Sequence, residues 1–157
     1  MKQYLDALKD VLENGTDRQS RTGIATKAVF GMQMRFNLEN GFPAVTTKKL
    51  AWNAVVSELL WFIEGSNDER RLAEILHGTR DANKTTIWTA NAEAGYWRPK
   101  AKFEGDLGRI YGVQWRRWKS PDGGEIDQLA NAIGIIKENP TSRRIIVSAW
   151  NPGELGQ

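Results

Sequence analysis

The sequence predicts an α/β fold, close to the α+β type, in which a mixed β-sheet is covered by helices. Segments with apolar residues at helical spacing alternate along the sequence with strand-like segments. The apolar faces of such strands must be covered by other elements. With 40% apolar residues, including seven tryptophans, the chain can bury a core. Its 157 residues match the size of one domain, and no repeat or linker divides them. We therefore expect residues 1–157 to belong to one domain.

The first third of the chain contains a predicted helix and a predicted strand. Apolar residues from Tyr4 to Leu12 recur at helical spacing, and Asn14-Gly15 ends the helix. From Phe30 to Leu38 every second residue is apolar, which predicts a strand with one buried face. The sequence NGFP that follows indicates a turn.

The rest of the chain predicts three helices and one strand. Residues 51–63 are apolar almost all round, which is typical of a buried helix. The sequence SNDE at 66–69 is a capping-box pattern that opens a second helix. After a PDGG turn, residues 126–136 predict an amphipathic helix that stops before Pro140. Residues 145–150 lack alternation, which predicts a strand covered on both faces.

The composition excludes several kinds of site. There is no cysteine, which rules out disulfides, thiolate metal sites and a cysteine nucleophile within these residues. The one histidine, His77, is expected at a helix end, and no metal site is expected. No apolar run approaches about 18 residues and the N-terminus does not resemble a signal peptide, so we expect a cytoplasmic protein without a membrane partner.

Positive charge is concentrated in residues 98–119, where seven lysines and arginines against two acidic residues give a net charge of +5. Such a stretch suits nucleic acid, a small anion or simply a solvated surface. Aromatic residues flank it, which suits flat anionic ligands such as nucleobases or a pterin, although core packing explains aromatic residues as well. They are Trp88, Trp97, Tyr111, Trp115 and Trp118.

Glu58 is the first candidate for catalysis. On a helical wheel it lies among the apolar residues of the 51–63 helix, away from the polar stripe of that helix. A carboxylate in an apolar arc is costly unless it is hydrogen-bonded or protonated. Two roles follow, a proton-handling group or a carboxylate that caps a buried donor, and the residues alone favour neither.

Paired arginines stand between a predicted helix and the predicted strand at 145–150. The guanidinium groups of Arg143 and Arg144 repel each other unless an anion bridges them, and phosphate suits their planar forks. Separate ion pairs with carboxylates elsewhere are equally compatible with the sequence. Arg21, in the segment SRTGIAT, is a third candidate. Neither a P-loop nor a GxGxxG pattern is present, so a triphosphate or a dinucleotide is not indicated.

Several motifs together resemble one family, the folate-dependent thymidylate synthases. The resemblance runs from the first residue to the last. Its motifs are MKQYLDALKDVLENGT, SRTGIAT, GFPAVTTKKL, ELLWFIEGSN, TIW, DLGRIYGVQWR and SRRIIVSAWNPGEL. The resemblance implies a thymidylate synthase-like fold and a methyltransferase that converts dUMP to dTMP. It also implies 5,10-methylenetetrahydrofolate as the donor of both carbon and hydride.

The resemblance implies roles for individual residues. Arg21, Arg143 and Arg144 match phosphate-binding arginines, and the last two would reach the partner's site in a homodimer with shared active sites. Glu58 matches the glutamate that organises water and proton transfers around the pyrimidine and the folate. The residues that match the lining of the cavity are Ile87, Trp88 and Tyr111. Nucleic acid is not an expected partner.

The resemblance also implies that this sequence is the N-terminal portion of the enzyme. In the family a Pro-Cys-His stretch soon follows SAWNPGEL, and its cysteine attacks the pyrimidine ring. Because this sequence has no cysteine, we expect it to be catalytically incomplete by itself. The stretch GYWRPKAKFEG resembles an insertion of viral members, such as those of phage.

Four residues near the folate region depart from the family's usual pattern. They are Ala51, Thr89, Asn91 and Arg109, which stand where a histidine, an acid, a tryptophan and a proline are usual. The departures keep open a second function, that of a deoxypyrimidine nucleotide hydroxymethylase acting on dUMP or dCMP. Such relatives add water instead of hydride to the same intermediate. The alternative of another class is a non-catalytic nucleotide-binding or dimerisation remnant.

Overall fold

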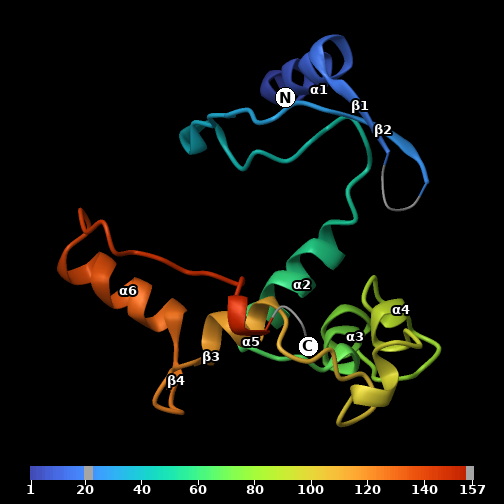
Figure 1. Ribbon diagram of the computed structural model, residues 1–157, viewed down its shortest axis with the longest axis vertical. Helices are drawn as coiled ribbons and strands as arrows, with labels where there is room; N and C mark the ends of the chain where they lie inside the picture. The colour runs from blue at the N-terminus through green and yellow to red at the C-terminus, as the bar shows by residue number, and fades with distance from the viewer. Residues whose placement is uncertain (20–22, 155–157) are drawn as a thin grey trace. The chain divides into compact units, whose positions relative to one another are not determined.

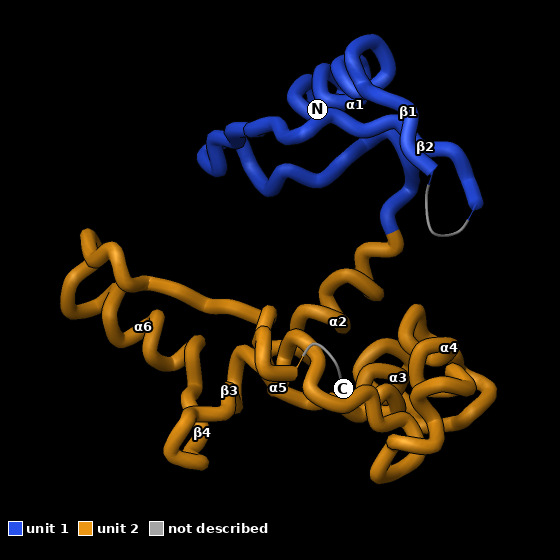
Figure 2. Tube along the Cα trace, viewed as in Figure 1, with its two compact units in different colours: residues 1–50 blue, residues 51–157 orange. Residues whose placement is uncertain are grey.

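The computed structural model describes residues 1–19 and 23–154. Arg21, one of the predicted phosphate ligands, lies outside the described residues. The chain divides into two compact units, Met1–Leu50 and Ala51–Gln157, which Figure 2 shows in blue and orange. That residues 1–157 belong to one domain stays a prediction.

The described part of the first unit contains a helix and a β-hairpin (Figure 1). Helix α1, Lys2–Asn14, ends where the sequence predicts, and the N–H of Gly15 donates to the carbonyl oxygen of Val11 at 3.0 Å. Strands β1, Thr16–Gln19, and β2, Ala25–Ala28, then pair antiparallel.

The strand predicted from Phe30 to Leu38 is wrong. These residues have no regular structure up to a 3₁₀ turn, η1, at Leu38–Asn40, and the described residues give them no strand partner. Phe30 is fully exposed and Met32 is partly exposed. Apolar alternation produces a strand only when a neighbouring strand accepts its hydrogen bonds and a layer covers its apolar face.

Most of the regular elements in the described part of the second unit are helices. Its helices are α2 (Trp52–Glu64), α3 (Glu69–His77), α4 (Thr89–Ala92), α5 (Tyr111–Arg116) and α6 (Gln128–Glu138). Its other elements are the antiparallel strands β3 (Trp118–Lys119) and β4 (Glu125–Ile126) and the 3₁₀ turns η2 (Arg98–Lys100) and η3 (Pro152–Glu154). Helix α2 contacts α3 and α5, and α5 also contacts α6 (Figure 1). Within the described ranges, no helix combines the length and apolar character needed to span a membrane.

Local sequence signals set the junction between α2 and α3. Helix α2 ends at Gly65, whose φ of +71° is the left-handed conformation that glycine adopts readily. Asp68 caps α3 by accepting a hydrogen bond from the N–H of Arg70 at 2.9 Å. The predicted capping box between Ser66 and Glu69 is therefore wrong. Asp68 takes the cap, and Glu69 is buried among tertiary partners.

The predicted PDGG turn, the helix after it and the place of the histidine are confirmed. Between β3 and β4 the N–H of Ser120 donates to the carbonyl oxygen of Gly124 at 2.9 Å. Asp127 caps α6 by accepting a hydrogen bond from the N–H of Ala130 at 2.9 Å, so α6 begins two residues later than predicted. His77 is the last residue of α3.

The core of the second unit lies where α2 meets α3. Its fully or almost fully buried apolar cluster is Trp61, Leu72, Ala92 and Leu107. The predicted burial of α2 on all sides is wrong, because Leu59 and Leu60 are about half exposed and only Ser57 and Trp61 are buried. An apolar sequence is buried all round only if neighbours cover each face, and the described residues cover one face of α2.

The strand predicted at residues 145–150 is also absent from the described structure. These residues are without regular structure and have no strand partner, and Ile146 and Trp150 are 69% and 70% exposed. A strand buried on both faces needs a sheet beside it and a layer on each side. The described residues supply neither.

Candidate active site

Aromatic side chains of the second unit gather around Phe62 on α2. The rings of Tyr111 and Trp115 on α5 meet Phe62 edge to face, at centroid distances of 5.4 and 5.7 Å. Trp88, the residue before α4, lies 6.2 Å from Phe62 and 6.0 Å from Tyr111. The structure therefore brings together Trp88 and Tyr111, two of the residues predicted to line one cavity.

Glu58 joins this cluster through a hydrogen bond. It lies half-buried on α2, one turn before Phe62, and its Oε1 accepts a hydrogen bond from the indole N–H of Trp88 at 2.6 Å. Among the described residues, its second oxygen, Oε2, accepts no hydrogen bond. A carboxylate anchored through one oxygen and free at the other can exchange a proton with a ligand or water.

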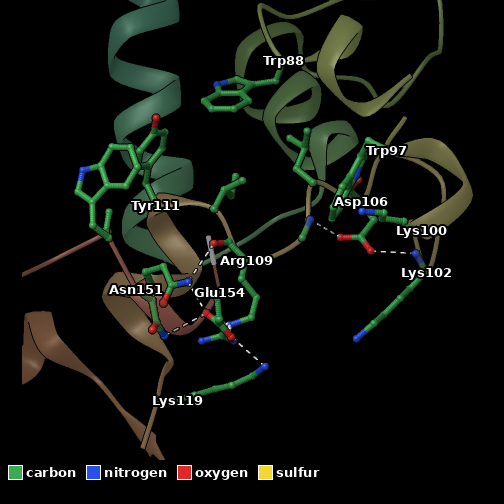
Figure 3. A pocket seen from close by; sticks show the side chains of 16 residues that line it. Trp88, Trp97, Lys100, Lys102, Asp106, Arg109, Tyr111, Lys119, Asn151 and Glu154 are labelled. Atoms are coloured by element: carbon green, nitrogen blue, oxygen red, sulfur yellow. Dashed lines mark hydrogen bonds and ion pairs between the residues drawn. The ribbon is translucent and has the colours of Figure 1, made fainter. Parts of the chain in front are cut away.

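A cavity of about 540 Å³ opens beside Trp88 and Tyr111 (Figure 3). Its walls carry aromatic and cationic side chains. They are Trp88, Trp97, Tyr111 and Trp150, and Lys100, Lys102, Arg109 and Lys119. The volume is within the range of about 300–1,000 Å³ that small-molecule sites occupy. The walls suit a flat anionic ligand.

Most of the positive charge of residues 98–119 has a partner within the chain. The pairs are Arg109 and Lys119 with Glu154, Arg116 with Asp127, and Arg117 with the carbonyl oxygen of Gly65. In the described ranges, the side chains of Arg98, Lys100 and Lys102 have no such partner. Two of these three free cations, Lys100 and Lys102, line the cavity. The free charge of this stretch therefore lies largely at the cavity.

Glu154 is the anion that organises the other side of the cavity (Figure 3). Its carboxylate accepts hydrogen bonds from Nε of Arg109 at 2.9 Å and Nε2 of Gln114 at 2.6 Å, and Nζ of Lys119 lies 2.9 Å away. Burial raises the pKa of Glu154, but the donors of Lys119, Gln114 and Arg109 outweigh burial and lower the pKa to about 2. The sequence did not single out Glu154. Its one signal was its place in the SAWNPGEL motif.

The predicted arginine pair lies in an exposed turn between α6 and residues 145–150. The backbone N–H of Arg144 donates to the hydroxyl of Ser142 at 3.2 Å. Neither Arg143 nor Arg144 pairs with a carboxylate in the part of the chain that the structure describes, and neither lines the cavity. Among the described residues, the two guanidinium groups are thus neighbouring cations that no carboxylate neutralises.

Ile87 is a predicted cavity-lining residue that the structure places outside the cavity lining. Its side chain is 82% exposed and does not line the cavity, although the adjacent Trp88 does. The structure thus unites Glu58, Trp88 and Tyr111, and leaves Ile87 outside that cluster.

Comparison with known proteins identifies the family of the chain. The family model described as thymidylate synthase matches residues 2–157. The crystal structure of thymidylate synthase from T4 phage matches with a TM-score of 0.86 and 47% sequence identity, over 99% of this chain and 52% of that chain. This match confirms the α/β fold class, and the chain spans about half the length of that structure. Because the family match covers almost every residue, the chain belongs to the thymidylate synthase family.

Proposed function

We propose that this chain forms the N-terminal half of a thymidylate synthase, which converts dUMP to dTMP with 5,10-methylenetetrahydrofolate. The observation that carries the proposal is the hydrogen bond from Trp88 to Glu58 beside an aromatic and cationic cavity. Membership of the family supports the type of reaction.

In this proposal Glu58 handles protons. Trp88 orients the carboxylate through Oε1, which leaves Oε2 to give a proton to the pyrimidine or take one from it, directly or through water. The rings of Phe62 and Tyr111 pack beside Trp88, the residue that holds the carboxylate.

The residues of the cavity fit the folate. A pterin ring is flat and the glutamate of a folate carries carboxylates, which match aromatic walls and the free cations of Lys100 and Lys102. Trp88 and Tyr111 would hold the ring region, and the two lysines would hold a carboxylate. When bound, methylenetetrahydrofolate supplies the one-carbon unit and the hydride.

The phosphate of dUMP would be bound by arginines. The proposal assigns this role to Arg21, Arg143 and Arg144, the last two reaching the partner's active site in a homodimer. The absence of a carboxylate partner for the described pair supports this role, because an anion that bridges two guanidinium groups relieves their repulsion. The nucleophile comes from outside these residues, since the sequence has no cysteine.

Turnover tests the proposal. The protein to assay is a fusion of this chain with the half of T4 phage thymidylate synthase that this chain does not match. We refer to this fusion as the completed enzyme. We expect it to release tritium from position 5 of dUMP and to form dihydrofolate, whereas the chain alone releases none above a blank without enzyme. A hydroxymethylated nucleotide without dihydrofolate would show a hydroxymethylase instead. Nucleotide binding without any product would show a non-catalytic protein.

Glu58→Gln gives a sharper test in the completed enzyme. The variant should bind dUMP nearly as tightly as the parent but turn over about 10²-fold more slowly, because a lost proton-transfer group has an effect of this size. Glu125→Gln is the control, since Glu125 is an exposed carboxylate on β4. Near-normal turnover by Glu58→Gln would leave Glu58 as a structural partner of Trp88 only.

A further inference from the structure

Glu69 is a buried carboxylate that the proposed reaction does not use. It is the first residue of α3 and is only 1% exposed. Its Oε1 accepts hydrogen bonds from the hydroxyl groups of Thr86 at 2.6 Å and Thr89 at 2.7 Å. Its Oε2 accepts a hydrogen bond from Nε of Arg70 at 2.6 Å and lies 2.5 Å from Nη2 of the same side chain. Both carboxylate oxygens therefore have partners.

Glu69 fixes the direction of the two threonine hydroxyl groups. A hydroxyl carries a single proton, and in Thr86 and Thr89 that proton points to Glu69. Each hydroxyl oxygen is then left to accept a backbone N–H. The hydroxyl of Thr86 accepts from the N–H of Trp88 at 3.1 Å, and that of Thr89 accepts from the N–H of Thr86 at 2.8 Å. Glu69 thus holds the backbone of residues 86–89 through both hydroxyl groups.

The segment held in this way carries Trp88. The backbone of Trp88 bonds to Thr86, and its indole N–H donates to Glu58 at 2.6 Å. A continuous series of hydrogen bonds therefore runs from Glu69 on α3 through Thr86 and Trp88 to Glu58 on α2. A shift in the backbone at Trp88 would carry the indole N–H away from Glu58.

We propose that Glu69 is a positioning residue, which sets the place of Trp88 through Thr86 and Thr89 and so orients Glu58. The inference rests on the proposed function, because Glu58 handles protons only there. The carboxylate comes from α3, and Thr89 is one of its hydrogen-bond donors.

Charge and burial support this role. Burial raises the pKa of Glu69, but hydrogen bonds from Thr86, Thr89 and Arg70 outweigh burial and hold the pKa below its usual value. The carboxylate is therefore an acceptor at neutral pH. Arg70 is itself fixed, because its Nη1 donates to the carbonyl oxygen of Asp81 at 2.8 Å. A buried carboxylate whose two oxygens both accept hydrogen bonds is held in one geometry.

The indole N–H resonance of Trp88 tests the inference. It is measured in the ¹⁵N-tryptophan-labelled chain and in the completed enzyme, and is assigned by its loss in Trp88→Phe. In Glu69→Gln and in Thr89→Val we expect this resonance to move and its hydrogen exchange to accelerate about tenfold, the factor that corresponds to about 1.4 kcal/mol. Thr89→Ser keeps the hydroxyl and should keep the parent signal.

Trp97 serves as the internal reference. Its indole N–H group donates to the carbonyl oxygen of Asp106 at 2.6 Å, so it reports any general loss of structure. The ring of Trp61 lies 6.0 Å from that of Trp88, so its resonance follows Trp88 and is no reference. Glu74→Gln is the matched control variant. Glu74 lies on the same helix but pairs with surface arginines, and its loss should leave the Trp88 resonance in place.

The outcomes separate a positioning role from a merely structural one. A change in the Trp88 resonance without a change in the Trp97 resonance, in both Glu69→Gln and Thr89→Val, supports the inference. If Glu69→Gln also disturbs the Trp97 resonance, the milder Thr89→Val decides by the same criterion. An unchanged Trp88 resonance in Thr89→Val, or the same change in Thr89→Ser as in Thr89→Val, would overturn the inference.

The readout needs no substrate, so it separates this inference from the proposed function. If the Trp88 resonance responds and the completed enzyme makes no dTMP, the proposed function fails and the positioning role of Glu69 stands. If dTMP forms and the resonance does not respond, the positioning role fails. With both intact, Glu69→Gln should lower kcat while the KM for dUMP changes little.

Discussion

At the residue scale, the side chain of Arg109 connects segments that lie apart in the sequence. Nε of Arg109 lies 2.8 Å from one oxygen of Glu154, and Nη2 donates to the carbonyl oxygen of Arg117 at 2.6 Å. One side chain therefore connects the segment before α5, the end of α5 and η3.

Glu154 should make the stability of the chain depend on acid pH. Its pKa is about 2 in the folded chain against an ordinary 4.5, so the unfolded chain takes up this proton first as the pH falls. The stabilisation is fully present above about pH 4.5 and is lost as the pH falls toward about 2. We expect the midpoint of urea unfolding to fall across this window. In Glu154→Gln the midpoint should be lower at pH 7 and depend less on pH.

The control for this titration is Glu125→Gln, whose exposed carboxylate on β4 should leave the pH profile parallel to that of the parent. A Glu154→Gln profile with the slope of the parent below pH 4.5 would contradict the role of this carboxylate.

Individual residues of the candidate site were predictable only where local pattern was enough. Glu58 stood out because a carboxylate lies in an apolar arc of one helix. Its partner Trp88 is 30 residues away, and no local pattern connects the two. Glu69 was mistaken for part of a capping box, since its bonds to Thr86 and Thr89 span 17 and 20 residues.

At the element scale, the packing of α2 against α5 requires the absence of a side chain at Gly112. A Cβ there would lie 2.6 Å from the carbonyl oxygen of Phe62 and 2.7 Å from its Cα. These are backbone atoms, which cannot turn aside as a flexible side chain can. The same approach of the two helices sets Tyr111 against Phe62 and so builds the aromatic cluster.

Gly112→Ala should therefore destabilise the chain by about 1–3 kcal/mol, the usual cost of overpacking. Gly134→Ala is the matched control, because Gly134 also lies in a helix but an added Cβ meets nothing within 4 Å. It should stabilise the chain by about 0.5–1 kcal/mol, since alanine is the better helix former. Urea unfolding measures both free energies. Equal effects of the two substitutions would show that no close approach exists at Gly112.

Elements with their own end signals were predictable, and elements that depend on distant partners were not. Helix α1 follows its apolar spacing to Gly15, and α6 begins at the cap that Asp127 provides. The segments at 30–38 and 145–150 have strand-like sequences but no strand partner in the described chain. Strand β1 was missed for the opposite reason, because Thr16–Gln19 is exposed throughout and shows no apolar alternation.

At the scale of the whole molecule, the distribution of charge favours small anions over nucleic acid. A nucleic-acid-binding surface presents a continuous basic face. In residues 98–119, four of the seven cations are instead bound to groups of the chain itself. The cations left free among the described residues include Lys100 and Lys102 at the cavity and the pair Arg143 and Arg144.

The arginine pair should contribute to nucleotide affinity in the completed enzyme. We expect Arg143→Ala and Arg144→Ala each to weaken dUMP binding by about 1.5–3 kcal/mol, the range for hydrogen bonds to charged groups. Isothermal titration with dUMP measures the change. Arg98→Ala, which removes an exposed cation that has no partner among the described residues, is the control and should bind as the parent does. Unchanged affinity in both variants of the pair would exclude a phosphate contact.

Mixing two inactive subunits tests whether the pair acts in the partner's site. One subunit lacks both arginines of the pair, and the other lacks the nucleophilic cysteine of the completed enzyme. If the pair reaches across the dimer, each mixed dimer holds one site without nucleophile and arginines and one site with both. Activity should therefore return on mixing, toward half that of the parent for each mixed dimer. If the arginines serve their own subunit, every site in a mixed dimer lacks one of the two features. Mixed dimers confirmed by mass and still inactive would then place Arg143 and Arg144 in the site of their own subunit.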